Sequence, residues 1–323
     1  MFQRPPSFFE IWRAHTRIRE YLAPTPLRKS LALSEQFGAA VFLKLENWQP
    51  TGSFKVRGAF NLLTQLTPAE IARGLVAASA GNHGAAVGYA AQQLQISNVH
   101  IFVPGATPHA KIQKMERFGV HVHAAGETYD DAHHAAVEYE RARDATFVHA
   151  YDDVRTVAGA GTMALEILNV TQDLDALLVP VGGGGMIAGI AVAVKHVAPD
   201  LRVIGIQPDA SPSLRDSLRD NVCYEEYTAA PTICDGLAGG IGQIVFQVAQ
   251  QKLLDDVLIV SERAVHQAVA AFARDEQMVV EGSGAVGLAA LLENPAMFRG
   301  KRVALVVSGA NVDAGRLAEI LGI

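Results

Sequence analysis

The amino-acid sequence predicts an α/β protein of two domains, each built on a mostly parallel twisted sheet that is flanked by helices. Three observations support this fold class. Apolar strand-like segments alternate with helix-like segments along the chain, which is typical of sheets with helical crossovers on both faces. Glycine-rich or polar loops follow several strands, where open α/β sheets bind their ligands. The 323 residues, 50% of them hydrophobic, suit about two domains.

The individual elements follow from local patterns. Continuous apolar runs predict strands that are buried on both faces, and the longer segments between them predict helices. One helix has a clear start, because Thr67 is a cap, Pro68 takes the first helical position and Glu70 completes a capping box. In chain order the elements are strand 39–46, helix 67–74, strand 74–79, helix 84–94, strand 98–104, helix 109–119, strand 120–126, helix 129–144, strand 145–150, helix 161–170, strand 176–181, helix 186–197, strand 202–209, helices 261–277 and 284–294, and strand 302–310.

The order of these elements also predicts the domain boundaries. Residues 75–151 contain about four strand–helix alternations, enough for a small domain inserted in a larger one. We therefore expect a large domain of residues 1–74 plus 152–323 and a small inserted domain of residues 75–151.

Composition and charge exclude several classes of protein. The net charge is −6 and the charged residues are interleaved, so no basic stripe indicates nucleic-acid binding. The two cysteines, Cys223 and Cys234, are too few for a disulfide framework, which favours a reducing compartment such as the cytoplasm. The N-terminus lacks the apolar core of a signal peptide. Residues 176–194 are uncharged, but Pro180 and four glycines make a membrane span a poor fit.

Lys55 is the first candidate for chemistry. It lies between Phe54 and Val56, inside a turn flanked by serine and glycine, "PTGSFKVRGAF". Burial lowers the pKa of a lysine, and this change is what makes its amine a nucleophile, a base or a Schiff-base partner. The alternative is a surface lysine whose stem covers apolar neighbours.

A glycine loop, "VGGGGMIAG", follows the predicted strand 176–181. The N–H groups of Gly182, Gly183, Gly184 and Gly185 can approach an anion closely, and the following helix adds its positive end. This arrangement predicts a phosphate site, although close packing of the helix on the sheet is an alternative. The same loop loosely fits a dinucleotide fingerprint through Gly183, Gly185 and Ala188, with Asp209 as the ribose acceptor.

Other polar residues also follow predicted strands. In "SAGNHG", Ser79, Asn82 and His83 supply more polar groups than helix capping requires, and they suit a carboxylate. Ser308 ends the last strand, and its hydroxyl can donate to or accept from a ring nitrogen. Glu281 ends an apolar stretch, so its carboxyl group needs a donor or a proton, unless it is an ordinary helix-start residue.

Taken together, these loops resemble the serine/threonine dehydratase and serine racemase family of fold-type II pyridoxal-phosphate enzymes, which are tryptophan synthase β-like. The resemblance covers essentially the whole chain. It is carried, in family order, by "SFKVRGA", "SAGNHG", "AYDDVRTVAGAGTMALEIL", "VPVGGGGMIAGIA", "TICDGLAGG", "VVEGSGAVGLAAL" and "VSGANVD".

The resemblance implies pyridoxal 5'-phosphate as cofactor and an amino acid as substrate. Lys55 would carry the cofactor as a Schiff base and later take the proton from the substrate α-carbon. The other implied cofactor-binding residues are Phe54, Asn82, Gly182, Gly183, Gly184, Gly185, Met186, Glu281 and Ser308. The implied substrate-binding residues are Ser79, Ala80, Gly81, Asn82 and His83. A dehydratase would release a 2-keto acid and ammonia, and the family's usual assembly is a homodimer.

Departures from the family pattern favour dehydration over racemisation. Members that racemise serine carry a second serine where this chain has Ala80, and a methyl group cannot transfer a proton. Differences at Ala150, Tyr151, Ala160 and Cys234 leave the substrate open: hydroxyaspartate, phenylserine or an intermediate of hydroxyectoine breakdown stay alternatives to threonine and serine. No regulatory domain, and so no end-product feedback, is expected after "NVDAGRLAEILGI".

No metal ion is expected. His121 and His123 share a strand face without an evident third ligand. Some relatives bind a divalent cation through two acids, and Gln207 and Ser213 stand in their place here. A neutral amide and a hydroxyl are weak ligands for a hard cation.

A different class of enzyme, a nicotinamide-dependent dehydrogenase, has only the glycine loop and Asp209 in its favour. A binding protein without catalysis would leave Lys55 unexplained.

Overall fold

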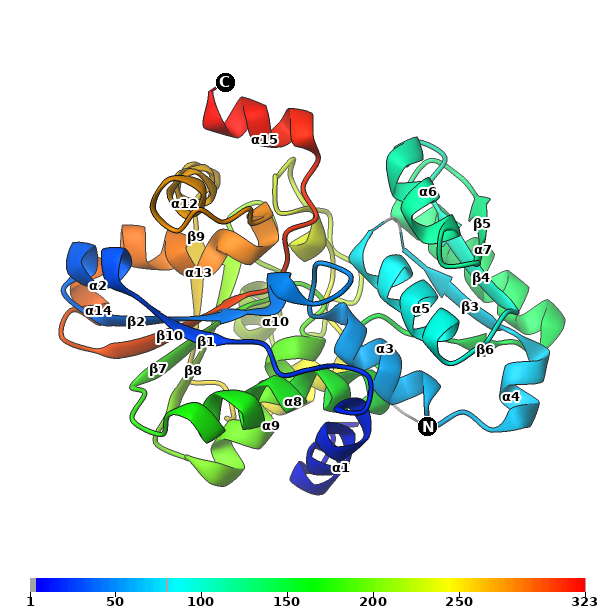
Figure 1. Ribbon diagram of the computed structural model, residues 1–323, viewed down its shortest axis with the longest axis horizontal. Coiled ribbons are helices and arrows are strands. Elements are labelled where there is room, and N and C mark those ends of the chain that lie inside the picture. Colours follow the sequence, from blue (N-terminus) through cyan, green and yellow to red (C-terminus); the bar gives the residue numbers. More distant parts are fainter. Residues whose placement is uncertain (1–3, 80, 323) are drawn as a thin grey trace.

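The computed structural model describes residues 4–79 and 81–322, and within them it contains two sheets that lie side by side (Figure 1). The strands are β1 (Leu27–Ser30), β2 (Ala40–Leu45), β3 (Leu75–Ala78), β4 (Val99–Val103), β5 (His121–Ala124), β6 (Thr146–Phe147), β7 (Ala176–Pro180), β8 (Arg202–Pro208), β9 (Asp256–Val260) and β10 (Arg302–Val307).

The helices connect these strands and cover both sheets. They are α1 (Phe8–Ile18), α2 (Leu31–Phe37), α3 (Lys55–Leu63), α4 (Pro68–Arg73), α5 (Asn82–Gln93), α6 (His109–Glu116), α7 (Tyr129–Arg143), α8 (Val154–Val170), α9 (Gly185–Val197), α10 (Ser213–Asp220), α11 (Gln243–Gln250), α12 (Glu262–Asp275), α13 (Gly282–Glu293), α14 (Pro295–Phe298) and α15 (Ala314–Leu321). Short 3₁₀ turns span Glu46–Trp48 and Asp235–Leu237. In this part of the chain no helix is both long and apolar enough to cross a membrane.

The larger sheet has six strands in the order β1-β2-β10-β7-β8-β9. All neighbours are parallel except β1, which pairs antiparallel with β2. Successive side chains of a strand point to opposite faces. Leu177 and Val179 therefore pack with α8 and α9 on one face, whereas Leu178 packs with α12 and α13 on the other. This double burial explains the continuous apolar runs in the sequence.

The smaller sheet has four parallel strands in the order β5-β4-β3-β6. Its face with Leu75 and Ala77 packs against α5 and α3, and its face with Val76 and Ala78 packs against α7. Helix α3 lies between the two sheets (Figure 1). The residue that begins α3 is Lys55, so this helix places the lysine at the junction of the sheets.

The α/β class with two helix-flanked, mostly parallel sheets is confirmed, and so is the capping box of Thr67 and Glu70. One predicted helix start is wrong, because α8 begins at Val154 rather than at residue 161. Its glycines allow close helix packing: a Cβ on Gly159 would lie 2.5 Å from the carbonyl oxygen of Arg57. The domain boundaries at residues 74/75 and 151/152 stay a prediction.

Candidate active site

Lys55 lies at the first position of α3, not within a turn as its flanking residues suggested. The backbone before it is held to the end of β10, since Phe54 N donates to Ser308 O (3.0 Å) and Ser53 forms a bridge with Gly309. Lys55 Nζ donates to Ala150 O at 3.1 Å and lies 5.2 Å from the centre of the Phe54 ring. The amine is thus held near two loops, after β6 and after β10.

The environment of Lys55 favours the neutral amine. Burial lowers its pKa to about 8, and the carboxyl group of Glu281 opposes this change only in part. Burial and the nearby Lys55 charge lower the pKa of His83 to about 3. The surface-lysine alternative is therefore not supported, because an exposed amine would keep its ordinary pKa.

A pH dependence follows from this pKa. The rate at which apo-protein takes up pyridoxal 5'-phosphate is expected to rise with pH and to reach half its maximum near pH 8, since only an unprotonated amine attacks an aldehyde. Stopped-flow absorbance would measure the rate, with an α-blocked lysine derivative as control. A midpoint at the ordinary lysine pKa, about 10.4, would contradict the buried environment.

The glycine loop joins β7 to α9. Gly184 has φ +83° and is the N-cap of α9, so the first turn of that helix directs unpaired N–H groups into the loop. The Tyr151 ring covers the loop: a Cβ on Gly183 would lie 2.4 Å from its Cγ. On the other side, a Cβ on Gly182 would lie 2.8 Å from Gly236 O. Side chains are excluded here, which leaves the backbone accessible to an anion.

Substitution of this loop has a predictable result. Gly185→Ala is expected to weaken uptake of pyridoxal 5'-phosphate by about tenfold or more, because the new Cβ would lie 2.6 Å from Tyr151 O and push the loops apart. Titration of apo-protein by absorbance would measure this. Gly287→Ala in α13 is the matched control, since its Cβ would meet only ordinary contacts of 3.4 Å or more. Equal affinities of both variants would contradict the assignment of the loop.

Asn82 and Glu281 meet at the junction between the sheets. Asn82 begins α5, and its Nδ2 donates to Glu281 Oε1 at 2.8 Å. Glu281 precedes α13 but makes no capping bond with its side chain; instead its Oε2 accepts from Asn311 N at 3.0 Å. Burial, together with the negative charge of Asp235, raises the pKa of Glu281 to about 7. Ordinary helix capping therefore does not account for either residue.

The rest of the "SAGNHG" loop is also at this junction. Ser79 Oγ accepts from Gly81 N at 3.2 Å, and Gly81 precedes α5. His83 Nε2 lies 2.8 Å from Val148 O, so it carries the proton and leaves Nδ1 as an acceptor. Ala80 lies outside the described residues.

Three further predicted residues are buried or half-buried at the ends of the elements that meet here. Ser308 is buried at the end of β10, and its Oγ lies 3.4 Å from Ser283 O, a long contact that leaves the hydroxyl free to turn. Met186 is buried in the first turn of α9, and Phe54 is half-buried beside Lys55.

Sequence reasoning missed two residues of this region. Tyr151 was noted as a departure from the family, but its position over the glycine loop was not predicted. Asn311 lies in the quoted motif "VSGANVD" without an assigned role, yet its backbone and side chain contact Glu281 and Asn82. Its place directly after the Ser308 loop was the available signal.

A buried ionic cluster holds α3 in place. Arg57 donates to both carboxylate oxygens of Glu46 (2.7 and 2.8 Å) and of Glu166 (2.7 Å each). Lys44 donates to Glu166 Oε2 at 2.5 Å. Because Arg57 lies two residues after Lys55, this cluster fixes the start of α3 against β2 and α8.

Gln207 and Ser213, the two residues predicted to replace the acids of a cation site, are hydrogen-bonded to each other. Gln207 Nε2 donates to Val181 O, Ser211 O and Ser213 Oγ at 3.3–3.4 Å. Its Oε1 accepts from the N–H groups that begin α10. Across residues 4–79 and 81–322 no cluster of three metal-ligating side chains occurs.

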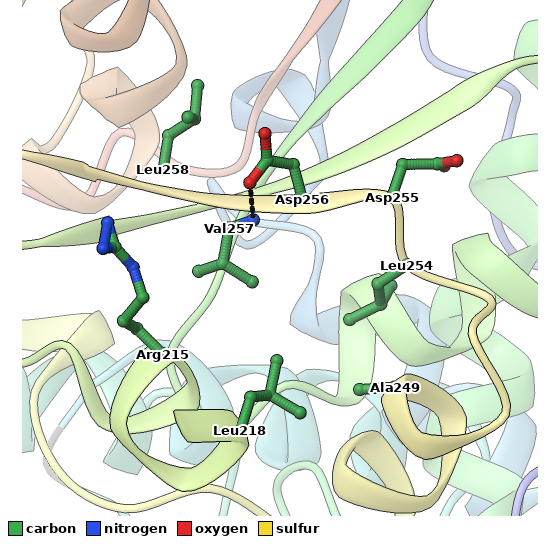
Figure 2. A pocket seen from close by; sticks show the side chains of 8 residues that line it. All are labelled: Arg215, Leu218, Ala249, Leu254, Asp255, Asp256, Val257 and Leu258. Carbon is green, nitrogen blue, oxygen red and sulfur yellow. Dashed lines mark hydrogen bonds between the residues drawn. The ribbon is translucent and has the colours of Figure 1, made fainter. Parts of the chain in front are cut away.

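A cavity of about 460 Å³ lies elsewhere, against the edge strand β9 (Figure 2). Arg215 and Leu218 of α10 line it, together with residues 254–258. The cavity includes the start of β9, whereas the glycine loop and Ser308 follow the carboxyl ends of their strands. None of its residues belongs to the candidate active site.

The residues present fit the predicted cofactor. Thr51 Oγ1, Ser53 Oγ and His83 Nδ1 are buried and have no hydrogen-bond partner among the described residues, although buried polar atoms normally have one. They accompany a lysine with a lowered pKa, the backbone N–H groups of the glycine loop, and the Ser308 hydroxyl, whose hydrogen bond is long. This set suits an aldehyde with a phosphate and a ring nitrogen.

Comparisons with known proteins agree with this arrangement. A family described as "Pyridoxal-phosphate dependent enzyme" matches residues 18–309. An L-threonine ammonia-lyase of Thermotoga maritima is 39% identical over 97% of this chain and 77% of its own length. A threonine deaminase of Solanum lycopersicum has a TM-score of 0.91 at 28% identity, over 100% of this chain and 92% of its own. Maize serine racemase has a TM-score of 0.90 at 30% identity, over 98% and 96%.

Proposed function

The chain belongs to the pyridoxal-phosphate dependent enzyme family, and from this premise we propose that it is a dehydratase that eliminates water from a β-hydroxy-α-amino acid of the threonine or serine type. The products are a 2-keto acid and ammonia. Relatives at 34–39% identity are named threonine ammonia-lyase or dehydratase. The observation that carries the proposal is Lys55, a half-buried amine with a pKa of about 8. It donates to Ala150 O, and the next residue, Tyr151, covers the glycine loop.

The bound cofactor supplies an electron sink for the negative charge that develops at the substrate α-carbon. The glycine loop and Met186 would hold its phosphate, Phe54 would pack on its ring, and Asn82 with Glu281 would bind the ring hydroxyl. Ser308 would serve the ring nitrogen. A hydroxyl, unlike a carboxylate, would not keep that nitrogen protonated, which would favour prompt loss of the β-substituent over return of the proton.

The chain's own residues would then move the proton. Lys55 Nζ takes it from the α-carbon, because a neutral amine at this position can act as a base near physiological pH. Ser79, Gly81, Asn82 and His83 bind the substrate carboxylate, with N–H groups at the start of α5 as donors. Burial of the site excludes water and strengthens these contacts.

Racemisation is the alternative that one comparison favours, since maize serine racemase is 30% identical and similar in fold. Racemisation needs a proton donor on the second face of the α-carbon. Ala80 cannot supply it, so we rank elimination first. Hydroxyaspartate, phenylserine and hydroxyectoine-derived amino acids remain alternative substrates.

The test is a substrate panel on loaded enzyme. Threonine, serine and the three alternative classes would be scored for keto-acid release, and for the opposite enantiomer by chiral chromatography. Keto acid from threonine or serine, at a rate unchanged by a chelator, is the expected result, because the neutral Gln207 and Ser213 stand in the place of the two acids that bind a cation in some relatives. An enantiomer that forms faster than the keto acid would contradict the ranking.

A homodimer and a cytoplasmic location are part of the proposal. Phe9 and Trp12 of α1, and Trp48 after β2, are half or more exposed, which supports a subunit contact at one of these places. Sedimentation of the loaded protein would measure the assembly.

A further inference from the structure

A chain of hydrogen bonds crosses the candidate site from α6 to the start of α13. Lys114 Nζ donates to Asn311 Oδ1 at 2.5 Å. Asn311 Nδ2 donates to Asn82 Oδ1 at 2.6 Å and to Thr51 O at 2.9 Å. Asn82 Nδ2 then donates to Glu281 Oε1 at 2.8 Å. Lys114 belongs to the part of the chain that carries the smaller sheet, whereas Asn311 and Glu281 belong to the larger one.

The groups at the two ends of this chain of hydrogen bonds determine which way each amide side chain is turned. An ammonium group has donors and no acceptor, so Lys114 must face the oxygen of the Asn311 amide. A carbonyl is only an acceptor, so Thr51 O must face the Asn311 nitrogen. Asn311 can then offer Asn82 nothing but a donor, and Asn82 must present its oxygen in return. The amide nitrogen of Asn82 is thereby turned toward Glu281.

The orientation of Asn82 matters because its Nδ2 has two hydrogens. One is used by Glu281. The other has no hydrogen-bond partner in residues 4–79 and 81–322, so it can donate to the ring oxygen of the cofactor. A reversed amide would present only an acceptor there, and the ring oxygen would lose this donor.

We propose that Lys114 is a positioning residue that sets the Asn82 amide, through Asn311, with its nitrogen toward the cofactor. This inference rests on the proposed function. The residue that packs on the Asn311 side chain must also be small. A Cβ on Gly52 would lie 2.8 Å from Asn311 Oδ1 and displace it. The effect of Lys114 on the cofactor is indirect, because its charge acts through two amides.

Lys111 provides a matched comparison on the same helix. Its Nζ lies 3.4 Å from Asp235 Oδ2, in an exposed ion pair that also joins the two sheets. Exposed pairs contribute little to stability. A general need for contacts between α6 and the larger sheet would make Lys111 and Lys114 equally important. Of these two lysines, however, only Lys114 is hydrogen-bonded to the Asn311 amide.

The experiment compares wild-type protein, Lys114→Met, Lys114→Arg, Asn311→Asp and Lys111→Met. Each apo-protein is titrated with pyridoxal 5'-phosphate, and the visible absorption band of the loaded protein is recorded. Lys114→Met is expected to bind about tenfold more weakly and to shift the band, because Asn311 loses a charge-assisted hydrogen bond and only Thr51 O is left to orient its amide. Asn311→Asp, which lacks the Nδ2 donor, is expected to show the same shift.

The other variants separate the explanations. Lys114→Arg should restore the wild-type band because it keeps a donor. Lys111→Met should change the affinity and the band much less than Lys114→Met, because Lys111 touches neither amide and acts on Glu281 only through its charge. Thermal unfolding of each apo-protein checks that the variants are folded; Asn311→Asp changes no volume and serves if Lys114→Met is unstable. Wild-type affinity and band in Lys114→Met, or equal losses in Lys111→Met, would overturn the inference alone. A wild-type protein that takes up no cofactor would overturn the proposed function as well.

Discussion

Lys55→Ala is expected to abolish covalent binding of pyridoxal 5'-phosphate and to lower turnover on the order of 10³-fold or more. Two roles are lost at once, the attachment of the cofactor and the base that takes the α-proton. Mass spectrometry after borohydride treatment would measure the attachment, and keto-acid release would measure turnover. The fold should persist, because removing a half-buried amine relieves the burial that lowers its pKa.

Lys29→Ala is the control for this change, since Lys29 is an exposed lysine on β1. It should keep one cofactor per chain and full turnover. If the Lys55→Ala protein retained a reduced adduct, or released keto acid at the wild-type rate, Lys55 would not be the catalytic residue.

Arg57→Met is expected to lower the free energy of unfolding by about 3–5 kcal/mol, because it leaves two buried carboxylates without their main partner. Glu46 is fully buried and Glu166 nearly so. Burial acts to raise the pKa of Glu46, but attraction to Arg57 outweighs it and holds that pKa at about 2. Urea titration of the apo-protein would measure the loss, and cofactor affinity should fall with it because α3 carries Lys55.

The same cluster predicts how stability depends on acid. A carboxyl group with a lowered pKa in the fold stabilises it above its unfolded pKa of about 4.3 and loses this contribution as the pH falls toward 2. Wild-type protein should therefore lose stability in this window, and Arg57→Met should lose less. Arg57→Lys is the matched variant: it keeps the charge without the fork of donors and should fall between the two. A loss below about 1 kcal/mol in Arg57→Met would show that the cluster is not stabilising.

Local patterns were enough to predict most elements of both sheets. Buried parallel strands are apolar throughout, so β3, β7 and β10 could be identified from composition alone. Thr67, Pro68 and Glu70 mark a helix start because a cap involves only residues close in sequence. The start of α8 was predicted at residue 161, seven residues too late. Two glycines near that point, Gly159 and Gly161, lie inside the helix, where they allow close contact with α3 and α9. The edge strand β1 has no continuous apolar run and was not predicted. The edge strand β9 was missed although its residues 257–260 are all apolar.

Some features of the candidate site could be predicted from short segments of the sequence, whereas others depend on the fold. Lys55 between two apolar residues and four glycines after a strand are contiguous signals, and their chemistry can be inferred without a fold. The contact between Asn82 and Glu281 joins residues 199 positions apart. Two other features depend on how the two sheets meet: the position of Tyr151 over Gly183, and the chain of hydrogen bonds from Lys114 to Asn82. No short segment contains that information.

Residue chemistry along the chain thus specifies the strands, the helices, the nucleophilic amine and the anion-binding backbone, because each depends on neighbours within a few positions. Three properties belong to the folded molecule alone: the lowered pKa of Lys55, the direction of the Asn82 amide, and the pairing of Arg57 with two buried carboxylates. They arise from burial and from partners that strand order brings together, and these partners lie far apart in the sequence.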